Sequence, residues 1–415
     1  MPSIEKILKV QLVMILCFTM PNLMMDIYVP QLHTLTTLVL YVTVLYTGIY
    51  VLKKKPKYTK SLVLFIIYFL IYSIVIYLDL TIDKKYPLSS MLGCPHSVTT
   101  FLVTTFIILF FILQAPLYQK IKDFGFLVKY YIIFNLPLVL LYISSIGVTK
   151  IQFDESITDI STLTLASTAS NSLLLALIFK DSFMKSKVAN NIILLIVFLA
   201  TMSVWGGLAK RGAILWFFVT LIIYFIFKSK NIKVTVFKFL LILAGIYMML
   251  PAVIPIIENF SPFLAERVEM TLVEGHTSGR MEEEGAYGFA IKQFLDSPIF
   301  GSYFRIITPN PIWRGMYPHN IILELLITFG IIGLLPFLYF LKLIFIKLRK
   351  NFCSDNSNRN SIEKVLGILF INIFFSMMTS GTILLSLPLW VNIAILLTIN
   401  NKKNDKLLNN NTTQK

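Results

Sequence analysis

Residues 61–80 read SLVLFIIYFLIYSIVIYLDL, an almost unbroken apolar stretch of twenty positions. At a helical rise of about 1.5 Å per residue, such a stretch is roughly 30 Å long, which matches the hydrocarbon thickness of a lipid bilayer. Apolar blocks of about 18–25 residues recur along the whole chain. We therefore expect this block to be one of a series of transmembrane helices.

The overall composition leads to the same expectation. Of the 415 residues, 56% are hydrophobic and only 14% are charged, and the mean hydropathy is +0.77. A soluble chain of this length cannot hide so much apolar surface from water, so lipid has to cover much of it. The sequence thus predicts an integral membrane protein.

The apolar blocks predict an all-α fold, a polytopic transmembrane bundle of about twelve helices. We expect a single transmembrane domain over residues 1–400 and a disordered cytoplasmic tail, rich in Asn and Lys, over residues 401–415. Lys6 and Lys9 precede an apolar run without a small-residue cleavage site, which indicates an uncleaved first helix. The expected helices lie near residues 8–26, 35–52, 61–80, 98–115, 126–147, 162–179, 188–206, 212–227, 239–257, 320–346, 364–380 and 382–400.

The basic residues indicate the orientation of these helices. A net charge of +16 on a soluble protein would suggest nucleic acid binding. Here the charges lie between apolar blocks, so topology and anionic lipid headgroups explain them better, and we expect no nucleic acid partner. With the N-terminus in the cytoplasm, 27 of the 37 Lys and Arg residues fall on the cytoplasmic side, which favours both termini inside. These residues lie within 1–10, 53–60, 120–129, 180–187, 228–238, 342–364 and 400–415.

One outer loop, about residues 258–319, is far longer than the others. Long loops in compact proteins are usually functional or disordered. The spacing of apolar residues within 260–268 predicts a short helix on the membrane surface, and residues 281–296 predict a second short helix. The residues expected on one face of the second helix are Tyr287, Ala290, Ile291 and Phe294.

Metal and disulfide chemistry are not indicated by the sequence. Cys17, Cys94 and Cys353 are far apart, fall in different compartments of this topology and form no C-x-x-C pattern. The adjacent glutamates 282–284 would point around a helix instead of converging on one ion, so a solvated helix face is favoured over a metal site. We therefore expect no metal and no other cofactor.

Cations on the outer side are candidates for binding an anionic substrate. Lys210 and Arg211 stand in a short outer turn, where the positive-inside rule disfavours them, and Arg280 precedes the glutamate run. A guanidinium group stays charged and can grip a phosphate through a bidentate fork. The plainer alternatives are that Lys210 and Arg211 bind lipid headgroups and that Arg280 pairs with the glutamates.

His319 is the candidate for proton transfer. It lies at the outer mouth of an apolar helix that begins at Asn320. An unperturbed imidazole, with a pKa of about 6.5, is mostly free to accept a proton at neutral pH, although a lone histidine at a membrane interface is usually structural. Glu324 follows about 500° further around the helix, so it does not share a face with His319 and is a poor orienting partner.

The order of these residues resembles a known signature. His319-Asn320, nine intervening residues and Gly330-Ile331-Ile332-Gly333 resemble the H-N-x9-G-x-x-G pattern of the O-antigen ligase and O-antigen polymerase superfamily. Asp296-Ser297-Pro298-Ile299-Phe300-Gly301 is similar to its D-x-P-x-x-G segment. Ser278-Gly279-Arg280 opens the long loop as in that family, and Lys210-Arg211-Gly212 stands where the family has S-R-G.

The match covers about residues 205–345, with Lys210 in place of the usual serine and Tyr303 in place of a common second glycine. The resemblance implies a metal-independent membrane glycosyltransferase of the GT-C type. Such enzymes use glycans carried on undecaprenyl pyrophosphate, at the outer face of the bacterial inner membrane. By the same resemblance, Arg211, Arg280 and Lys210 would bind the pyrophosphate, and His319 would accept the proton of an acceptor sugar hydroxyl. Supporting positions would be Asn320, Gly301, Gly330 and Gly333, the last two by allowing close helix packing beneath the site.

Three functions remain open at this stage. A polymerase joins repeat units, with lipid-linked glycans as both donor and acceptor, and a chain-length regulator protein is a further candidate partner. A ligase transfers the finished glycan to lipid A core or to protein. We favour the polymerase, because polymerases of this family vary widely and often have helices rich in Tyr and Lys. A flippase would instead predict two related halves and cations along the bundle interior, whereas the cations here collect at the outer mouth.

Overall fold

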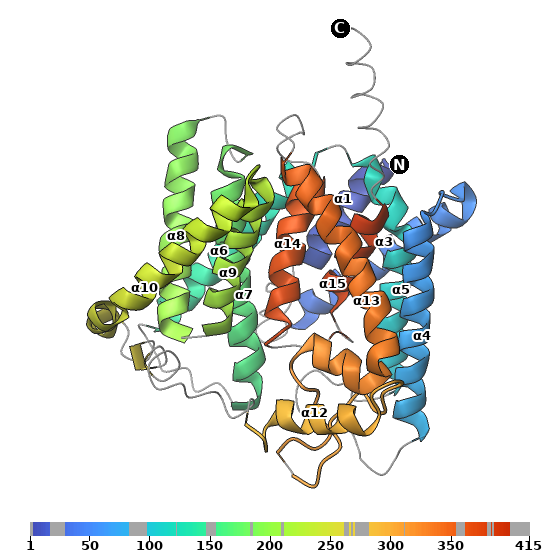
Figure 1. The fold of residues 1–415 in the computed structure, drawn as a ribbon. Helices are drawn as coiled ribbons and strands as arrows, with labels where there is room; N and C mark the ends of the chain where they lie inside the picture. Colours follow the sequence, from blue (N-terminus) through green and yellow to red (C-terminus); the bar gives the residue numbers. More distant parts are fainter. Residues whose placement is uncertain are drawn as a thin grey trace, which may run out of the picture.

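The protein is all-helical in the computed structural model (Figure 1). Helices make up 83% of it, and the described residues contain no β-strand. Four described helices are long and apolar enough to cross a membrane, Lys60–Thr81, Phe101–Lys120, Lys187–Trp205 and Ile321–Cys353. The structure describes residues 3–16, 30–82, 98–121, 123–146, 155–182, 186–208, 211–260, 265–266, 269, 282–310, 312–353, 362–379, 383 and 386–398.

A helix lies at each of the twelve positions expected from the sequence. That all twelve cross a membrane does not follow, because length and apolarity single out only the four helices above. The elements are α1 (Ile4–Leu16), α3 (Pro30–Lys54), α4 (Lys60–Ile82), α5 (Val98–Gln114), η1 (Ala115–Lys120), α6 (Gly125–Ile146), α7 (Glu155–Ile178), η2 (Lys180–Ser182), α8 (Lys187–Leu208), α9 (Arg211–Lys228), α10 (Ile232–Phe260), α12 (Ala286–Asp296), α13 (Ile321–Cys353), α14 (Ile362–Ser376) and α15 (Leu387–Thr398).

Some boundaries differ from the expectation. The first helix was expected over residues 8–26, but α1 ends at Leu16, and residues 17–29 lie outside the described residues. α12 begins at Ala286 instead of residue 281, because residues 282–285 form a turn. The short helix expected within 260–268 and the tail 401–415 fall largely or wholly outside the described residues.

The two faces of α4 show why this fold needs lipid. Its inward stripe is buried against neighbouring helices and follows the alternating three- and four-residue spacing of one helix face. Its outward stripe is equally apolar but is exposed. A helix that is apolar all round is typical of a membrane span. The inward residues are Leu62, Phe65, Phe69, Tyr72 and Ile76, and the outward ones include Leu64, Ile67, Ile71 and Ile74.

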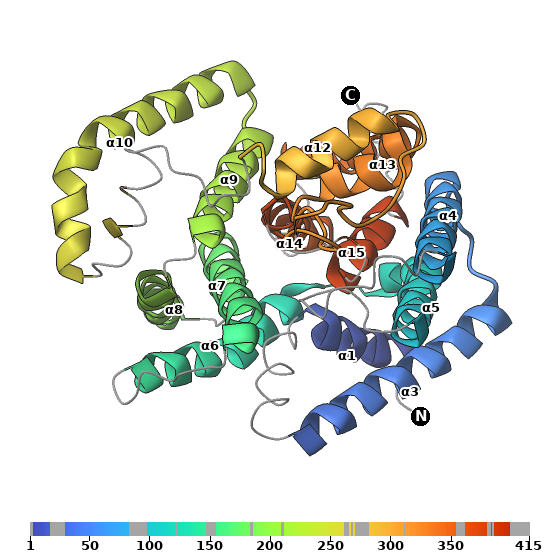
Figure 2. The same cartoon turned by 90° about the horizontal axis from the view of Figure 1, so that it is seen from below.

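The end-on view places α14 and α15 at the centre, with α3, α4 and α5 on one side and α6 to α9 on the other (Figure 2). α15 is buried from Leu389 to Thr398. Its Trp390 ring packs against Phe65, Phe69 and Tyr72 of α4, with ring centroids 5.5, 4.9 and 5.4 Å apart. Aromatic packing of this kind ties the centre of the bundle to α4.

Candidate functional site

The sequence motifs meet at one end of the bundle. α12 lies across this end in both views, roughly perpendicular to α4, α8 and α14 (Figures 1 and 2). Residues 297–320 lead from α12 to the start of α13. Hydrogen bonds join the start of α13 to the turn after α14, residues 377–379, and join this turn to the first part of α9.

His319 stands immediately before α13 in a left-handed backbone conformation, with φ of 56°. This conformation is uncommon for residues other than glycine and costs of order 1–3 kcal/mol. The side chain is partly buried, and its ring lies against Tyr317 with 4.3 Å between ring centroids. Strained backbone persists only where its surroundings impose it, and it clusters at functional sites.

Asn320 fixes the backbone next to His319. Its Oδ1 accepts hydrogen bonds from the N–H groups of Ile322 (2.9 Å) and Leu323 (3.1 Å), which caps the start of α13. Its Nδ2 donates to the carbonyl of Met378 at 3.1 Å. One side chain therefore caps α13 and attaches it to the turn after α14.

This turn also joins α9 and α12. The Trp216 indole of α9 donates to Thr379 Oγ1 at 2.8 Å, and a Cβ on Gly212 would lie 3.1 Å from the same oxygen. The Tyr287 hydroxyl of α12 donates to the Met378 carbonyl at 3.4 Å. The first turns of α9 and α12 and the His319-Asn320 pair are thus linked through two consecutive residues, Met378 and Thr379.

Of the three cations expected to bind the substrate, only the backbone of Arg211 is described. Arg211 is the first residue of α9 and precedes Gly212, which packs on Thr379. The structure therefore brings the start of the Arg211 helix to the same end of the bundle as His319. Lys210 and Arg280 lie outside the described residues.

α13 is broken at Gly330, where φ is 61° and ψ is −158°. A break leaves backbone groups without their partners in the helix, and the 298–302 segment supplies replacements. The N–H groups of Ile331 and Ile332 donate to the carbonyls of Pro298 (2.9 Å) and Ile299 (3.3 Å). The N–H of Ser302 donates to the carbonyl of Ile327 at 2.6 Å.

Two motif glycines make this junction possible. A Cβ on Gly301 (φ 71°) would collide with the backbone of Phe329, and a Cβ on Gly330 would collide with the backbone of Ile299. We expected Gly330 to allow close packing against another helix. Gly330 instead lies against the loop backbone at Ile299. At Gly333 a Cβ would meet the Phe329 side chain of the preceding turn of the same helix.

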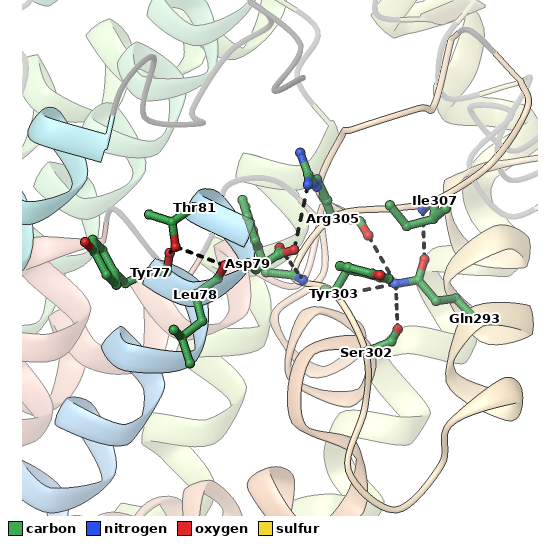
Figure 3. A network of polar contacts seen from close by, with 10 residues as sticks. Tyr77, Leu78, Asp79, Thr81, Gln293, Ser302, Tyr303, Arg305 and Ile307 are labelled. Carbon is green, nitrogen blue, oxygen red and sulfur yellow. Dashed lines mark hydrogen bonds and ion pairs between the residues drawn. The ribbon is translucent and has the colours of Figure 1, made fainter. Parts of the chain in front are cut away.

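A buried ion pair attaches the loop to α4 (Figure 3). Arg305 Nη2 lies 3.7 Å from Asp79 Oδ1, and the two side chains are only 2% and 5% exposed. Asp79 Oδ2 also accepts a hydrogen bond from the backbone N–H of Phe304 at 3.4 Å. Sequence reasoning passed over this pair, although a lone carboxylate near the end of the apolar stretch 61–80 was a usable signal.

Gln293 of α12 holds the same loop from the other side (Figure 3). Its Nε2 donates to the Ser302 hydroxyl (3.2 Å) and to the carbonyls of Tyr303 (3.3 Å) and Arg305 (3.1 Å). Its Oε1 accepts from the N–H of Ile307 at 2.9 Å. A single buried amide therefore shapes residues 302–307, including the position where Tyr303 departs from the family pattern.

Glu324 is fully buried in α13, and its carboxylate hydrogen-bonds to groups other than His319. Its Oε1 accepts from the Tyr72 hydroxyl (3.3 Å) and its Oε2 from the N–H of Ile383 (3.2 Å). These bonds brace the first part of α13 against α4 and the segment before α15. The carboxylate in the apolar helix is thereby accounted for by hydrogen bonding.

The glutamates 282–284 are exposed, as expected of a solvated segment. Glu283 pairs with Lys292 of α12 at 2.9 Å, and this hydrogen bond and the lysine charge lower the pKa of the Glu283 carboxyl. Within the described part of the chain, no group of three or more His, Cys, Asp or Glu side chains is arranged to hold a metal ion.

No family model matches this sequence, and no curated protein is significantly similar to it.

Proposed function

We propose that this protein is a membrane glycosyltransferase that polymerises undecaprenyl-pyrophosphate-linked oligosaccharide repeat units into O-antigen or a related surface polysaccharide. The observation that carries the proposal is the strained, capped His319-Asn320 pair at one end of the bundle. The Gly301–Gly330 junction and the start of the Arg211 helix lie at this same end. These are the segments in which the sequence resembles the O-antigen ligase and polymerase superfamily.

The proposed setting is the bacterial inner membrane. Twelve helices form a single transmembrane domain, both termini are cytoplasmic, and the end that carries His319 faces outward. The exposed apolar stripes of helices such as α4 support a lipid environment. The asymmetric distribution of Lys and Arg supports the orientation.

The proposed reaction uses the described histidine as a general base. A hydroxyl of the acceptor sugar attacks the anomeric carbon of the donor, and His319 takes the hydroxyl proton. The new glycosidic C–O bond replaces the bond from the anomeric carbon to the pyrophosphate. Undecaprenyl pyrophosphate leaves with its bonding electron pair, and Arg211 and Arg280, with Lys210, stabilise the charge that develops on it.

The direct test is turnover by the purified protein in lipid nanodiscs. Supplied only with the lipid-linked repeat unit, it should produce a ladder of longer lipid-linked glycans and release undecaprenyl pyrophosphate. A flippase would move the donor across vesicles but would form no glycosidic bond. A ligase would leave the lipid-linked donor unchanged until lipid A core or protein acceptor is added.

The arginines provide a second test of the same chemistry. Arg211→Lys and Arg280→Lys keep the positive charge but lose the planar fork, so turnover should fall while expression stays normal. Full activity in both variants would favour simple attraction of lipid headgroups over a bidentate role. Lys233→Arg, in the basic segment before the apolar part of α10, is a matched control that should leave turnover unchanged.

A further inference from the structure

α12 has three distinct sectors around its axis. Ala286, Ala290 and Gln293 are buried against α13 and the loop. Lys292 and Asp296 form an exposed polar sector. At about 100° per residue, Ile291 and Leu295 fall together in a third sector, between the other two. This third sector is apolar but exposed, at 46% and 65%.

The exposed Ile291 corrects the expectation that it shares the inward face with Tyr287, Ala290 and Phe294. Tyr287 and Phe294 do pack on the small cluster around Ala290, but Ile291 points away from it. The face of α12 that packs on protein is formed by Ala286, Ala290 and Gln293. The exposed apolar sector therefore requires a different environment.

This sector continues into the outward face of α13. Ile299 and Phe300, just beyond α12, are 56% and 73% exposed. The backbone of Ile299 bonds to Ile332, so the loop and the helix are in direct contact. From there the outward face of α13 is apolar and exposed at Ile331, Ile332, Leu335, Leu338 and Tyr339, and the exposed Lys342 follows on the same face.

α13 is the longest of the four helices that can cross a membrane, and the segment after the break at Gly330, residues 331–353, still spans about 34 Å at about 1.5 Å per residue. Its outward stripe from Ile331 to Tyr339 therefore faces acyl chains. Since α12 lies roughly perpendicular to upright helices such as α4, which is long and apolar enough to cross a membrane, its axis runs along the membrane plane (Figure 1). Its apolar sector then meets the same lipid at the edge of the bilayer.

We propose that Ile291, Leu295, Ile299 and Phe300 form an interfacial anchor that inserts into the acyl chains of one membrane leaflet. Lys292 and Asp296 stay at the aqueous side of this anchor, as in amphipathic helices that lie in a membrane interface. Tyr287, one helical turn before Ile291 on α12, donates a hydrogen bond to the Met378 carbonyl, which also accepts from Asn320. The anchor thus holds the wall of the candidate site at a fixed depth in the bilayer.

The test measures the environment of individual positions by spin labelling. Cys17, Cys94 and Cys353 are replaced by Ser, and single cysteines are introduced as Leu295→Cys, Phe300→Cys, Lys292→Cys and Asp296→Cys. The labelled proteins are reconstituted in vesicles of phosphatidylethanolamine and phosphatidylglycerol. Collisions with oxygen, which partitions into lipid, are compared with collisions with a water-soluble nickel chelate.

Labels at 295 and 300 should collide mainly with oxygen, and labels at 292 and 296 mainly with nickel. Nickel access at all four positions would overturn the proposal by placing α12 in water, and low access to both reagents at 295 and 300 would overturn it by showing a protein contact. As a second measurement, Leu295→Trp in the protein with its native cysteines should be quenched by brominated acyl chains more than Asp296→Trp. Equal quenching would also overturn the proposal. None of these readouts depends on the glycosyltransferase activity.

Discussion

His319 has two roles, because its backbone adopts a left-handed conformation and its imidazole is the proposed general base. These roles can be separated by substitution. Asparagine tolerates the left-handed conformation and glycine adopts it without strain, but neither side chain can replace an imidazole as a base. The pair of variants therefore distinguishes a structural histidine from a catalytic one.

We expect His319→Asn and His319→Gly to accumulate normally and to unfold at or near the wild-type temperature. Their turnover on purified lipid-linked donor should fall by about 10²–10⁴-fold, the usual contribution of a general base. His319→Ala should lose the same activity and also some stability, because alanine adopts positive φ less readily than histidine, asparagine or glycine. A well-folded His319→Asn protein with near wild-type turnover would remove the base assignment.

Asp79 and Arg305 form a buried ion pair, so the effect of replacing either residue depends on the other. Removing one charge leaves the other without compensation inside the protein, which typically costs about 3–5 kcal/mol. Asp79→Ala and Arg305→Met should therefore each lower the free energy of unfolding substantially. The double variant should lose less than the sum of the two, because no isolated charge remains.

The control for this cycle is the exposed pair of Glu283 and Lys292, whose side chains are 83% and 54% exposed. Lys292→Ala should change stability little, because water screens exposed ion pairs. Thermal unfolding in one detergent compares all four variants. Additive losses at Asp79 and Arg305 would show that the two side chains act independently.

At the scale of the elements, the fold depends on the break in α13 at Gly330. A loop about thirty residues earlier in the chain replaces the backbone hydrogen bonds that this break removes. α13 can turn at Gly330 only because residues 298–302 accept and donate the backbone hydrogen bonds that the break releases. At each glycine of this junction, the backbone of the facing segment fills the space that a Cβ would need. The junction holds the loop that leads to His319.

Gly301→Ala and Gly330→Ala should therefore prevent normal accumulation, because each methyl group would collide with backbone that cannot shift freely. Gly48→Ala is the matched control. Its methyl group would meet the Phe110 ring at 3.4 Å, an ordinary contact, and alanine favours the helical conformation of α3. Membrane levels and size-exclusion profiles measure the difference. A well-accumulated Gly330→Ala protein would contradict the proposed backbone contact.

The sequence predicts the helices well because the length of an apolar block depends only on local composition. It predicts the elements of the site less fully, since their partners are remote in the chain. Nothing near Gly330 reveals that residues 298–302 will contact it, and nothing near Asp79 reveals Arg305. The exposure of Ile291 escaped prediction for a related reason. Apolar spacing identifies a face that avoids water, but it does not distinguish a face against protein from a face against lipid.

At the scale of the whole molecule, the arrangement joins segments that are far apart in sequence at one end of the bundle. The start of α9, α12 and the start of α13 all meet there. The charge distribution predicts that this end is extracytoplasmic, since the long loop about 258–319 belongs to the side with the fewer Lys and Arg residues. The proposed reaction requires the same side, because the lipid-linked repeat units are joined at the outer face of the membrane.

Reporter fusions test this orientation directly. Alkaline phosphatase folds only outside the cytoplasm, because its disulfides need an oxidising compartment. A fusion at position 290, within α12, should be active, whereas a fusion at position 355, beyond the other end of α13, should be inactive. A cytoplasmic fluorescent reporter at the same two positions should give the reverse pattern. An inactive phosphatase at 290 together with an active one at 355 would place His319 in the cytoplasm, away from the lipid-linked glycans. The proposed chemistry would then lose its substrate, even though the helices and the contacts of the site would be unchanged.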